Sequence, residues 1–436
     1  MSRLGLLLSA TLLVVAACGD DATTTTATTG SLPGSTTSTQ PTSTIGSTAP
    51  STTTTSTTLP STTTTASAPV TTHPGLPAAA SRSLIPWDQV DQGWVVVRYE
   101  ATTTSYSQTG PYVIYLVSPG GQLYEIRAFT DSDPIVGEVE AFSNDGRQVV
   151  LQLIDRVSLD RSVVSLSLES GLYTTVLNLG GTSHATLGTT LPTGRDVVVL
   201  REDASTSTDS LEIYRTNGDL FSAIASKPSG GFPFTWLYSL DGTHIVVNDG
   251  NSAGMVVYSN TGTQVRTLSI PSGSGLCEPV RWWSSQTILA ACVDSSVLAA
   301  NGFYHELWLV PYDGSPPMVF TASTPGGWAS SDFGYANAWG QDPPILQWHG
   351  DCAAGALEAL FQMDLSTTPV SVAVGGSPFV HARAGTGLVI HSVIGCGDYY
   401  GPVSLIGADG SLLTTLVPAI TGYIGVTSVA AMIPTP

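Results

Sequence analysis

The chain of 436 residues predicts an all-β fold, a β-propeller of seven four-stranded blades, from three observations. Strand–turn–strand segments recur along residues 84–436, and a second series of such segments interleaves with the first. Together they place four strands in every ~45–50 residues, which is the period of a propeller blade. No window of this region shows a sustained apolar stripe at helical spacing.

The first series of hairpins is regular. Segments such as "VIYLVSPGGQLYEI" and "VSLIGADGSLLTTL" alternate β-branched and polar residues on both sides of a turn. The turns centre on Gly120, Gly171, Gly218, Gly262, Gly314, Thr368 and Gly410. Glycine adopts the positive φ that tight hairpins need, so these positions predict the last two strands of each blade.

The second series, which includes "FSNDGRQVVL", "YSLDGTHIVV" and "ARAGTGLVIH", contains six hairpins rather than seven. Strands without a partner stand instead at the two ends of the domain, in 93–100 and 425–433. We expect these two strands to pair antiparallel, so that the C-terminal strand completes the first blade and hides both edges. Six or eight blades remain open because 328–376 is irregular, and two packed β-sandwiches are the rival fold.

The Asp-Gly turns carry a family resemblance. Tyr238-Ser239-Leu240-Asp241-Gly242 and Phe142-Ser143-Asn144-Asp145-Gly146 are similar to the WD40-like repeat of TolB-type propellers, whose motif runs roughly W-S-P-D-G-x-x-I. The resemblance covers two blades well and the others by spacing. It implies the propeller fold and a role in binding other proteins, and it brings no catalytic residues.

The N-terminus reads "MSRLGLLLSATLLVVAAC", with an apolar run too short to span a bilayer. Val15-Ala16-Ala17-Cys18 resembles the lipobox of bacterial lipoproteins. The resemblance implies that residues 1–17 are a signal peptide, that Cys18 carries lipid, and that the protein is extracytoplasmic and anchored to the bacterial cell membrane. The alternative is an ordinary secretory signal with an incidental cysteine.

Residues 22–80 are almost wholly Thr, Ser, Pro, Ala and Gly, so the sequence predicts a disordered tether over 18–83, with Cys18 at its start. The propeller domain is then expected over 84–436. The formal net charge of −19, with the single lysine Lys227, excludes nucleic acid as a partner. The expected partners are the membrane, through the lipid, and an envelope protein or glycan, with the chain itself a monomer.

Four cysteines remain after Cys18, and an even number outside the cytoplasm predicts disulfides rather than free thiols. Cys277 and Cys292 flank a predicted two-residue turn at Ser284-Ser285, which places them opposite each other. Cys352 and Cys396 then pair by elimination and would join adjacent loops.

No nucleophile elbow, phosphate-binding loop or metal-binding motif occurs, so the sequence predicts no catalytic residues, metal or cofactor. A disulfide between Cys352 and Cys396 would gather polar residues on one rim, which predicts a ligand site there; the alternative is that they are ordinary loop residues. The residues concerned are His349, Asp351, Asp398 and Tyr400.

The strands expected to line the centre carry few charges, and these form no repeating set: Glu138, Glu140, Glu278, Arg281 and Asp332. Tryptophans fall on strands, and the adjacent Trp282 and Trp283 must face opposite ways. Packing between blades is the plain interpretation of these rings, and stacking on sugars is the functional one.

These observations favour a surface-tethered binding module for protein or glycan over an enzyme. The alternative is an envelope polysaccharide hydrolase or lyase with its site at the propeller centre, and a sensor domain of a larger assembly is a third possibility. Clustering of the central charges would favour the enzyme, and scattered charges would favour binding.

Overall fold

The structure is a computed structural model of the chain. It describes residues 70–100, 112–130, 132–180, 184–203, 206–229, 234–248, 254–272, 274–294, 305–321, 334–340, 344–349, 358–362, 370–373, 376–393, 401–419 and 426–432. The propeller lies within a compact unit of residues 66–436. Within the described ranges, no helix has the length and apolar character to cross a membrane.

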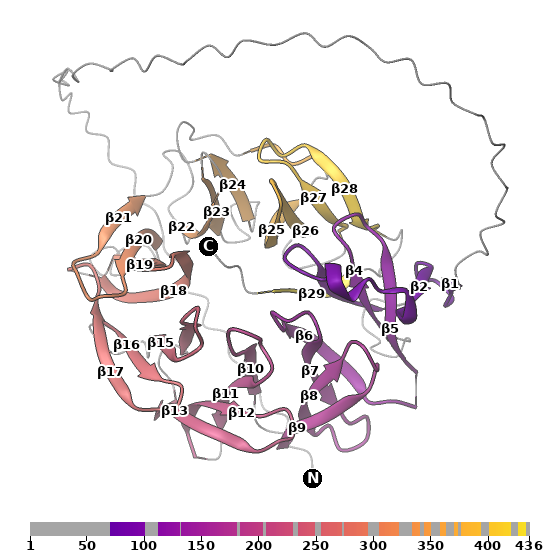
Figure 1. Cartoon of the computed structure of the whole chain (residues 1–436), viewed down its shortest axis with the longest axis horizontal. Helices are drawn as coiled ribbons and strands as arrows, with labels where there is room; N and C mark the ends of the chain where they lie inside the picture. The colour runs from indigo at the N-terminus through magenta and orange to yellow at the C-terminus, as the bar shows by residue number, and fades with distance from the viewer. Residues whose placement is uncertain are drawn as a thin grey trace, which may run out of the picture. The chain divides into compact units, whose positions relative to one another are not determined.

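The propeller unit is a ring of seven blades, as the sequence predicts (Figure 1). In each blade antiparallel strands follow one another from the centre outward, and the first blade is completed by the last strand of the chain. Blade 1 consists of β29 (Val426–Ala431), β3 (Val95–Glu100), β4 (Tyr112–Val117) and β5 (Leu123–Phe129). Blade 2 consists of β6 (Ile135–Phe142), β7 (Gln148–Ile154), β8 (Arg161–Ser167) and β9 (Tyr173–Gly180).

The next three blades repeat the same order. Blade 3 contains β10 (His184–Thr189), β11 (Val197–Asp203), β12 (Thr208–Tyr214) and β13 (Leu220–Pro228). Blade 4 contains β14 (Thr235–Tyr238), β15 (His244–Asn248), β16 (Gly254–Ser259) and β17 (Gln264–Ser269). Blade 5 contains β18 (Ser274–Ser284), β19 (Thr287–Asp294), β20 (His305–Pro311) and β21 (Met318–Thr321).

The last two blades complete the circle. Blade 6 contains β22 (Gly334–Trp339), β23 (Ile345–His349) and β24 (Glu358–Gln362). Val370 lies on the outer side of β24, where its N–H donates to the Leu360 carbonyl at 2.7 Å. Blade 7 contains β25 (Ser377–Ala384), β26 (Gly387–Val393), β27 (Val403–Ile406) and β28 (Leu412–Val417).

The predicted closure of the ring is confirmed. β29 pairs antiparallel with β3, with Val426 opposite Tyr99 and Ala431 opposite Val95. Ser428 of β29 also accepts a hydrogen bond at 3.0 Å from the backbone N–H of Val139 in blade 2. The C-terminal strand therefore covers the inner edge of β3, which would otherwise be an unpaired apolar edge.

The folded unit begins earlier than the boundary expected at Leu84. β2 (Ala79–Ser81) pairs in parallel with β5, and β1 (Val70–Thr71) pairs with β2. Two short 3₁₀ helices follow, η1 (Arg82–Leu84) and η2 (Trp87–Gln89). The structure thus places residues 70–83, assigned to the tether by composition, on the outer edge of blade 1. Their alignment depends on a strand from elsewhere in the chain, which composition does not show.

The core lies in layers between neighbouring blades. All residues of β3 and β4 are buried, because each strand has a blade on both faces. Trp282 and Trp283 face opposite ways, as predicted. Trp282 packs on Tyr312 with ring centroids 5.3 Å apart, and Trp283 packs on Phe320 at 4.7 Å. Both of these rings belong to blade 5. Trp282 is also buried against Leu237 of blade 4, and Trp283 packs on the cluster that contains Leu346 of blade 6, so packing between blades accounts for the pair as well.

The predicted disulfide between Cys277 and Cys292 is present. The two residues are directly opposite in the β18–β19 ladder, with their Cα atoms 4.0 Å apart. The bridge joins the two inner strands of blade 5 and is buried between blades. The pairing of Cys352 with Cys396 lies outside the described residues, and so does Cys18.

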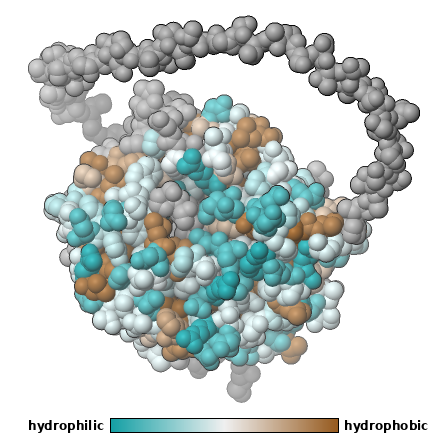
Figure 2. All heavy atoms as spheres, viewed as in Figure 1, coloured by the Kyte–Doolittle hydropathy of each residue, from teal (hydrophilic) through white to brown (hydrophobic). Residues whose placement is uncertain are grey.

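The two ends of the ring differ in their connections. We call the end that carries the tight hairpin turns, such as 143–147 and 239–243, the turn face. We call the opposite end, where the second strand connects to the third and each blade connects to the next, the loop face. Figure 2 shows a mainly hydrophilic surface on the side viewed, with apolar patches spread around it. Exposed apolar residues that begin outer strands include Leu172, Leu220, Val265, Met318 and Leu412.

Candidate functional site

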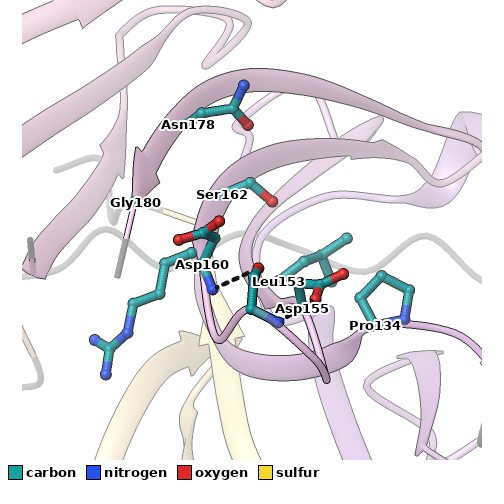
Figure 3. Close-up of a pocket in the computed structure, with 9 residues that line it drawn as sticks. Pro134, Leu153, Asp155, Asp160, Ser162, Asn178 and Gly180 are labelled. Atoms are coloured by element: carbon teal, nitrogen blue, oxygen red, sulfur yellow. Dashed lines mark hydrogen bonds between the residues drawn. The ribbon is translucent and has the colours of Figure 1, made fainter. Parts of the chain in front are cut away.

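A pocket of about 450 Å³ opens on the loop face of blade 2, beside the connection from blade 1 (Figure 3). Blade 2 contributes the ends of three strands and the connection between β7 and β8, and Pro134 comes from the connection between the two blades. The lining residues are Pro134, Leu153, Asp155, Ser158, Asp160, Arg161, Ser162, Asn178 and Gly180.

One row of the blade 2 sheet forms part of the pocket wall. Leu153 of β7 is opposite Ser162 of β8, which in turn is opposite Asn178 of β9. Directly opposed residues share one face of a sheet, so the three side chains project to the same side. Leu153 is buried in the cluster shared with blade 1, so this side faces blade 1. Along this row the side chains change from apolar at Leu153 to polar at Ser162 and Asn178.

The connection 155–160 is a compact loop held by its own hydrogen bonds. The Asp155 Oδ1 atom accepts from the backbone N–H groups of Val157 at 2.9 Å and Ser158 at 2.7 Å. The Asp155 carbonyl accepts from the N–H of Leu159 at 3.0 Å, and the Asp155 N–H donates to the Asp160 carbonyl at 2.9 Å. Such side-chain bonds to local backbone replace a ladder and give a defined turn.

The loop is also fixed to the neighbouring connection. Arg156 Nε donates to the Asp133 carbonyl at 2.8 Å, and Asp133 Oδ2 accepts from the N–H and the hydroxyl of Thr130 at 2.7 and 2.9 Å. These bonds join the loop of blade 2 to the segment that carries Pro134. Two sides of the pocket are therefore placed relative to each other before any ligand arrives.

The hydrogen bonds of the loop favour the ionised form of Asp155. Hydrogen bonds from the backbone of Ser158 and Val157 lower the pKa of Asp155 below its usual value, because they stabilise the charged form. Asp160 is exposed, and no side chain in the described part of the chain pairs with its carboxylate. With Arg161, hydroxyls and the Asn178 amide, the pocket offers both donors and acceptors to a polar ligand.

A second group of ionisable residues lies on the innermost strand of blade 2. Burial, with the nearby Glu138 carboxylate, raises the pKa of Glu140 to about 7. Gln152 opposes this shift by donating to Glu140 Oε1 at 3.1 Å, and the same amide nitrogen donates to the Ala185 carbonyl of blade 3 at 2.9 Å. A carboxyl group in this condition exchanges its proton near neutral pH.

The adjacent part of blade 1 contains a buried ion pair. Arg98 Nη2 lies 3.2 Å from Glu100 Oε2, and the Arg98 guanidinium lies over the Tyr112 ring at 4.4 Å. Burial lowers the pKa of Arg98, and burial raises the pKa of Glu100 although Arg98 opposes that rise. Arg98 and Glu100 are therefore buried and paired with each other inside blade 1.

The remaining central charges lie elsewhere on the ring. Glu278 and Arg281 belong to β18 of blade 5, away from β6 in Figure 1. Arg281 is buried, stacks on the Trp339 ring at 3.8 Å and donates to the Ala338 carbonyl at 3.1 Å. Burial, with a smaller effect of Arg383, lowers the pKa of Arg281 to about 9. The described central charges are therefore scattered between blades 2 and 5, and Asp332 lies outside the described residues.

The ligand rim predicted from sequence lies largely outside the described residues. Only the backbone of His349 is described, at the end of β23, where it pairs with Gly334 and Glu358. Asp351, Asp398 and Tyr400 are not among the described residues. Over the same described ranges, no group of three His, Cys, Asp or Glu residues is arranged to hold a metal ion.

Sequence reasoning missed the pocket. Its residues come from three strands and from the connection to the previous blade, so no short motif contains them. The available signal was "LIDRVSLDRS" at 153–162, in which the second hairpin strand ends in a polar loop instead of a glycine turn. The loop carries apolar residues between two aspartates, which is unusual for a solvated connection.

Comparisons with known proteins find only distant structural similarity. No family model matches the chain, and no curated protein sequence matches it. One similar solved structure is the β-propeller domain of the trilobed protease from Pyrococcus furiosus, at 12% identity and a TM-score of 0.48, covering 76% of this chain and 96% of that chain. Another is TolB from Acinetobacter baumannii, at 13% identity and a TM-score of 0.40, covering 73% of this chain and 62% of that chain.

A third similar structure is an oligogalacturonate lyase from Vibrio parahaemolyticus, at 9% identity and a TM-score of 0.42, covering 71% of this chain and 89% of that chain. The likeness to TolB spans less than two thirds of the TolB chain. All three identities lie below 25%, so function does not transfer from them. The strand order and the β29–β3 ladder define this chain as a seven-blade β-propeller closed by its C-terminal strand.

Proposed function

We propose that this protein is a lipid-anchored binding protein of the bacterial envelope, and that its loop face recognises a protein or glycan. The observation that carries the proposal is the loop-face pocket of blade 2, whose loop is hydrogen-bonded to the connection from blade 1. A site that is ordered in advance loses less conformational entropy on binding, which is the usual property of a recognition surface.

The scattered central charges support binding over catalysis. Glu140 and Arg281 lie on different blades, and Arg281 is engaged with Trp339 and a backbone carbonyl. Catalysis at the centre of the ring would need an acid and a base that converge on one reacting bond. The charge of −19 adds a second preference, since it favours cationic partners and disfavours anionic ones.

The anchoring part of the proposal rests on Val15-Ala16-Ala17-Cys18 and on the Thr/Ser/Pro-rich segment after it. A flexible tether of this kind would hold the propeller roughly 40 Å from the membrane. Growth with a labelled fatty acid tests the anchor: the chain should take up the label, and a Cys18→Ala variant should not. A labelled Cys18→Ala variant would contradict the assignment.

The binding proposal is tested by capture from an envelope extract with the mature chain as bait. A double variant in the pocket wall, Ser162→Ala/Asn178→Ala, should lose the captured component. A control on the exposed outer strand β17, Gln264→Ala/Thr267→Ala, should retain it. Treating the extract with protease or with glycosidases then identifies the class of the component. Equal capture by all three proteins would reject the loop face as the binding surface.

A hydrolase or lyase acting on envelope polysaccharide is the second candidate, and one observation favours it. Glu140 has a pKa of about 7, which suits a general acid or base at neutral pH. Release of new reducing ends from purified envelope polysaccharide, abolished by Glu140→Gln, would establish this activity. Release that persists in the variant would exclude Glu140 as its catalytic residue.

A further inference from the structure

The loop 155–160 has an unusual surface. Val157 is 94% exposed and Leu159 is 60% exposed, although both are large apolar residues. They are two positions apart on one turn and stand beside the polar pocket. Most of the other exposed apolar residues described lie at or beside the start of an outer strand, as Leu172, Leu220 and Leu412 do. An apolar pair next to a pocket is typical of a contact surface for another macromolecule.

The exposure of these side chains is imposed by the backbone. The N–H groups of Val157 and Leu159 are both bound to Asp155, through its carboxylate and its carbonyl respectively. Leu159 has φ of 61°, a left-handed conformation that is rare outside glycine. The loop therefore cannot easily turn the two side chains inward, and it presents them in one conformation.

Charged side chains lie next to the apolar pair. Asp155 and Asp160 flank it in sequence and line the pocket, and Arg161 is the one basic residue among the lining side chains. Arg156, on the same loop, is engaged with the neighbouring connection through its Nε, which donates to the Asp133 carbonyl. The Asp160 carboxylate has no side-chain partner among the described residues, and the chain as a whole carries −19. A cationic group that enters the pocket would gain a charge-assisted hydrogen bond there.

We infer that the loop 155–160 and its pocket bind a polypeptide segment that places an apolar side chain beside a lysine or arginine. The apolar side chain would cover Val157 and Leu159, and the basic side chain would extend toward Asp160. This inference rests on the proposed function and names its partner class. A glycan fits less well, because the pocket lining contains no aromatic ring for a sugar to stack on. A second copy of the chain fits less well, because it would bring −19 against −19.

The test is selection from a random 12-residue peptide library with the mature chain as bait. Counter-selection uses the double variant Val157→Ser/Asp160→Asn, in which both contacts are removed and every backbone hydrogen bond of the loop is retained. We expect the selected peptides to be enriched in lysine or arginine within a few residues of leucine, isoleucine or phenylalanine.

Single variants separate the two contacts. Val157→Ser and Asp160→Asn should each weaken binding of a selected peptide at least fivefold, and added salt should weaken binding to the wild type more than to Asp160→Asn. The matched control is Leu172→Ser, which removes an apolar residue that is 67% exposed in the same blade but on the turn face. It should leave the affinity unchanged.

Two results would overturn the inference. One is that selection gives no peptide that distinguishes the wild type from the double variant, and the other is that Leu172→Ser weakens binding as much as Val157→Ser. The wider proposal fails in a different way, when the pocket-wall variant captures the envelope component as well as the wild type does. If envelope capture depends on Ser162 and Asn178 but the captured component resists protease, the loop face binds a glycan and only the peptide inference fails.

Discussion

On both the turn face and the loop face, an aspartate side chain accepts hydrogen bonds from nearby groups and fixes a turn, but the two turns contact different things. On the turn face, Asp241 Oδ1 accepts from the Ser239 hydroxyl at 2.6 Å and from the Thr243 N–H at 3.0 Å. On the loop face, Asp155 accepts from two backbone N–H groups in a similar way. Both aspartates have a pKa below the usual value, and the Ser239 hydroxyl is the main cause for Asp241, whose pKa is about 2.

The two turns differ in the residue that adopts the left-handed conformation. In the turn 239–243 it is Gly242, with φ of 71°, whereas in the loop 155–160 it is Leu159, with φ of 61°. Gly242 packs against the turn of blade 3, and Leu159 is exposed. On the turn face, glycine is therefore needed at position 242 because the neighbouring blade leaves no room for a side chain there. The loop face retains a leucine where folding would favour glycine, which points to contact with something outside the chain.

The largest expected effect is on the turn face. A Cβ atom at Gly242 would lie 2.7 Å from the carbonyl carbon of Leu191, in addition to the strain of a positive φ. Gly242→Ala should therefore lower the free energy of unfolding by about 3 kcal/mol or more. Gly314 is the matched control, since it has φ of 89° but its Cβ would meet nothing within 4 Å.

Gly314→Ala should cost only the conformational penalty, about 1 kcal/mol. Urea denaturation followed by tryptophan fluorescence measures both. Equal losses in the two variants would show that contact between turns contributes nothing, and the distinction between the two faces would rest on φ alone.

A smaller effect is expected on β6, which runs from the loop face to the turn face. The pKa of Glu140 is raised from 4.5 to about 7, so the folded protein binds this proton more tightly than the unfolded chain does. Wild-type stability from this group is complete below pH 4.5 and is lost as the pH rises through 7. Glu140→Gln should therefore stabilise the fold at pH 8, by up to about 3 kcal/mol, and change it little at pH 4.5.

Denaturation midpoints at pH 4.5 and pH 8 check this sign. Glu202→Gln, at an exposed position of β11, is the control and should not change the pH dependence of stability. If Glu140→Gln is less stable than the wild type at pH 8, the carboxylate is needed in its charged form and its burial is not the dominant cause of the shift.

The smallest effect belongs to the loop face. Leu159→Gly relieves the left-handed strain and removes a mostly exposed side chain, so it should stabilise the fold by about 0.5–1 kcal/mol. Val157→Gly, at a position without positive φ in the same loop, should destabilise the fold by a similar amount. Thermal denaturation resolves the two directions. A loss of stability in Leu159→Gly would mean that the leucine supports the loop rather than a partner.

Much of the fold was predictable because its signals are local. The alternation of strand residues, the glycine turns and the period of the hairpins predicted the propeller fold, and the missing seventh hairpin predicted the β29–β3 ladder. The Cys277–Cys292 bridge followed from the register of one hairpin. The site was not predictable in this way, because its residues come from three strands of blade 2 and from the connection that carries Pro134, and no short segment of the sequence contains them.

The sequence by itself determined the hairpin period, the closure of the ring and one disulfide, since each can be read from the pattern or the register of hairpins along the chain, whereas the choice of seven blades over six or eight came from the structure. The tertiary structure decided the rest. It placed residues 70–83 on blade 1, where β2 pairs in parallel with a strand that lies more than forty residues further on, Ala80 opposite Tyr124. It also set the pKa of Glu140, which depends on burial between blades and on Glu138 rather than on the carboxyl group alone. Burial and long-range pairing arise from the packing of separate segments, and no local window of residues contains them.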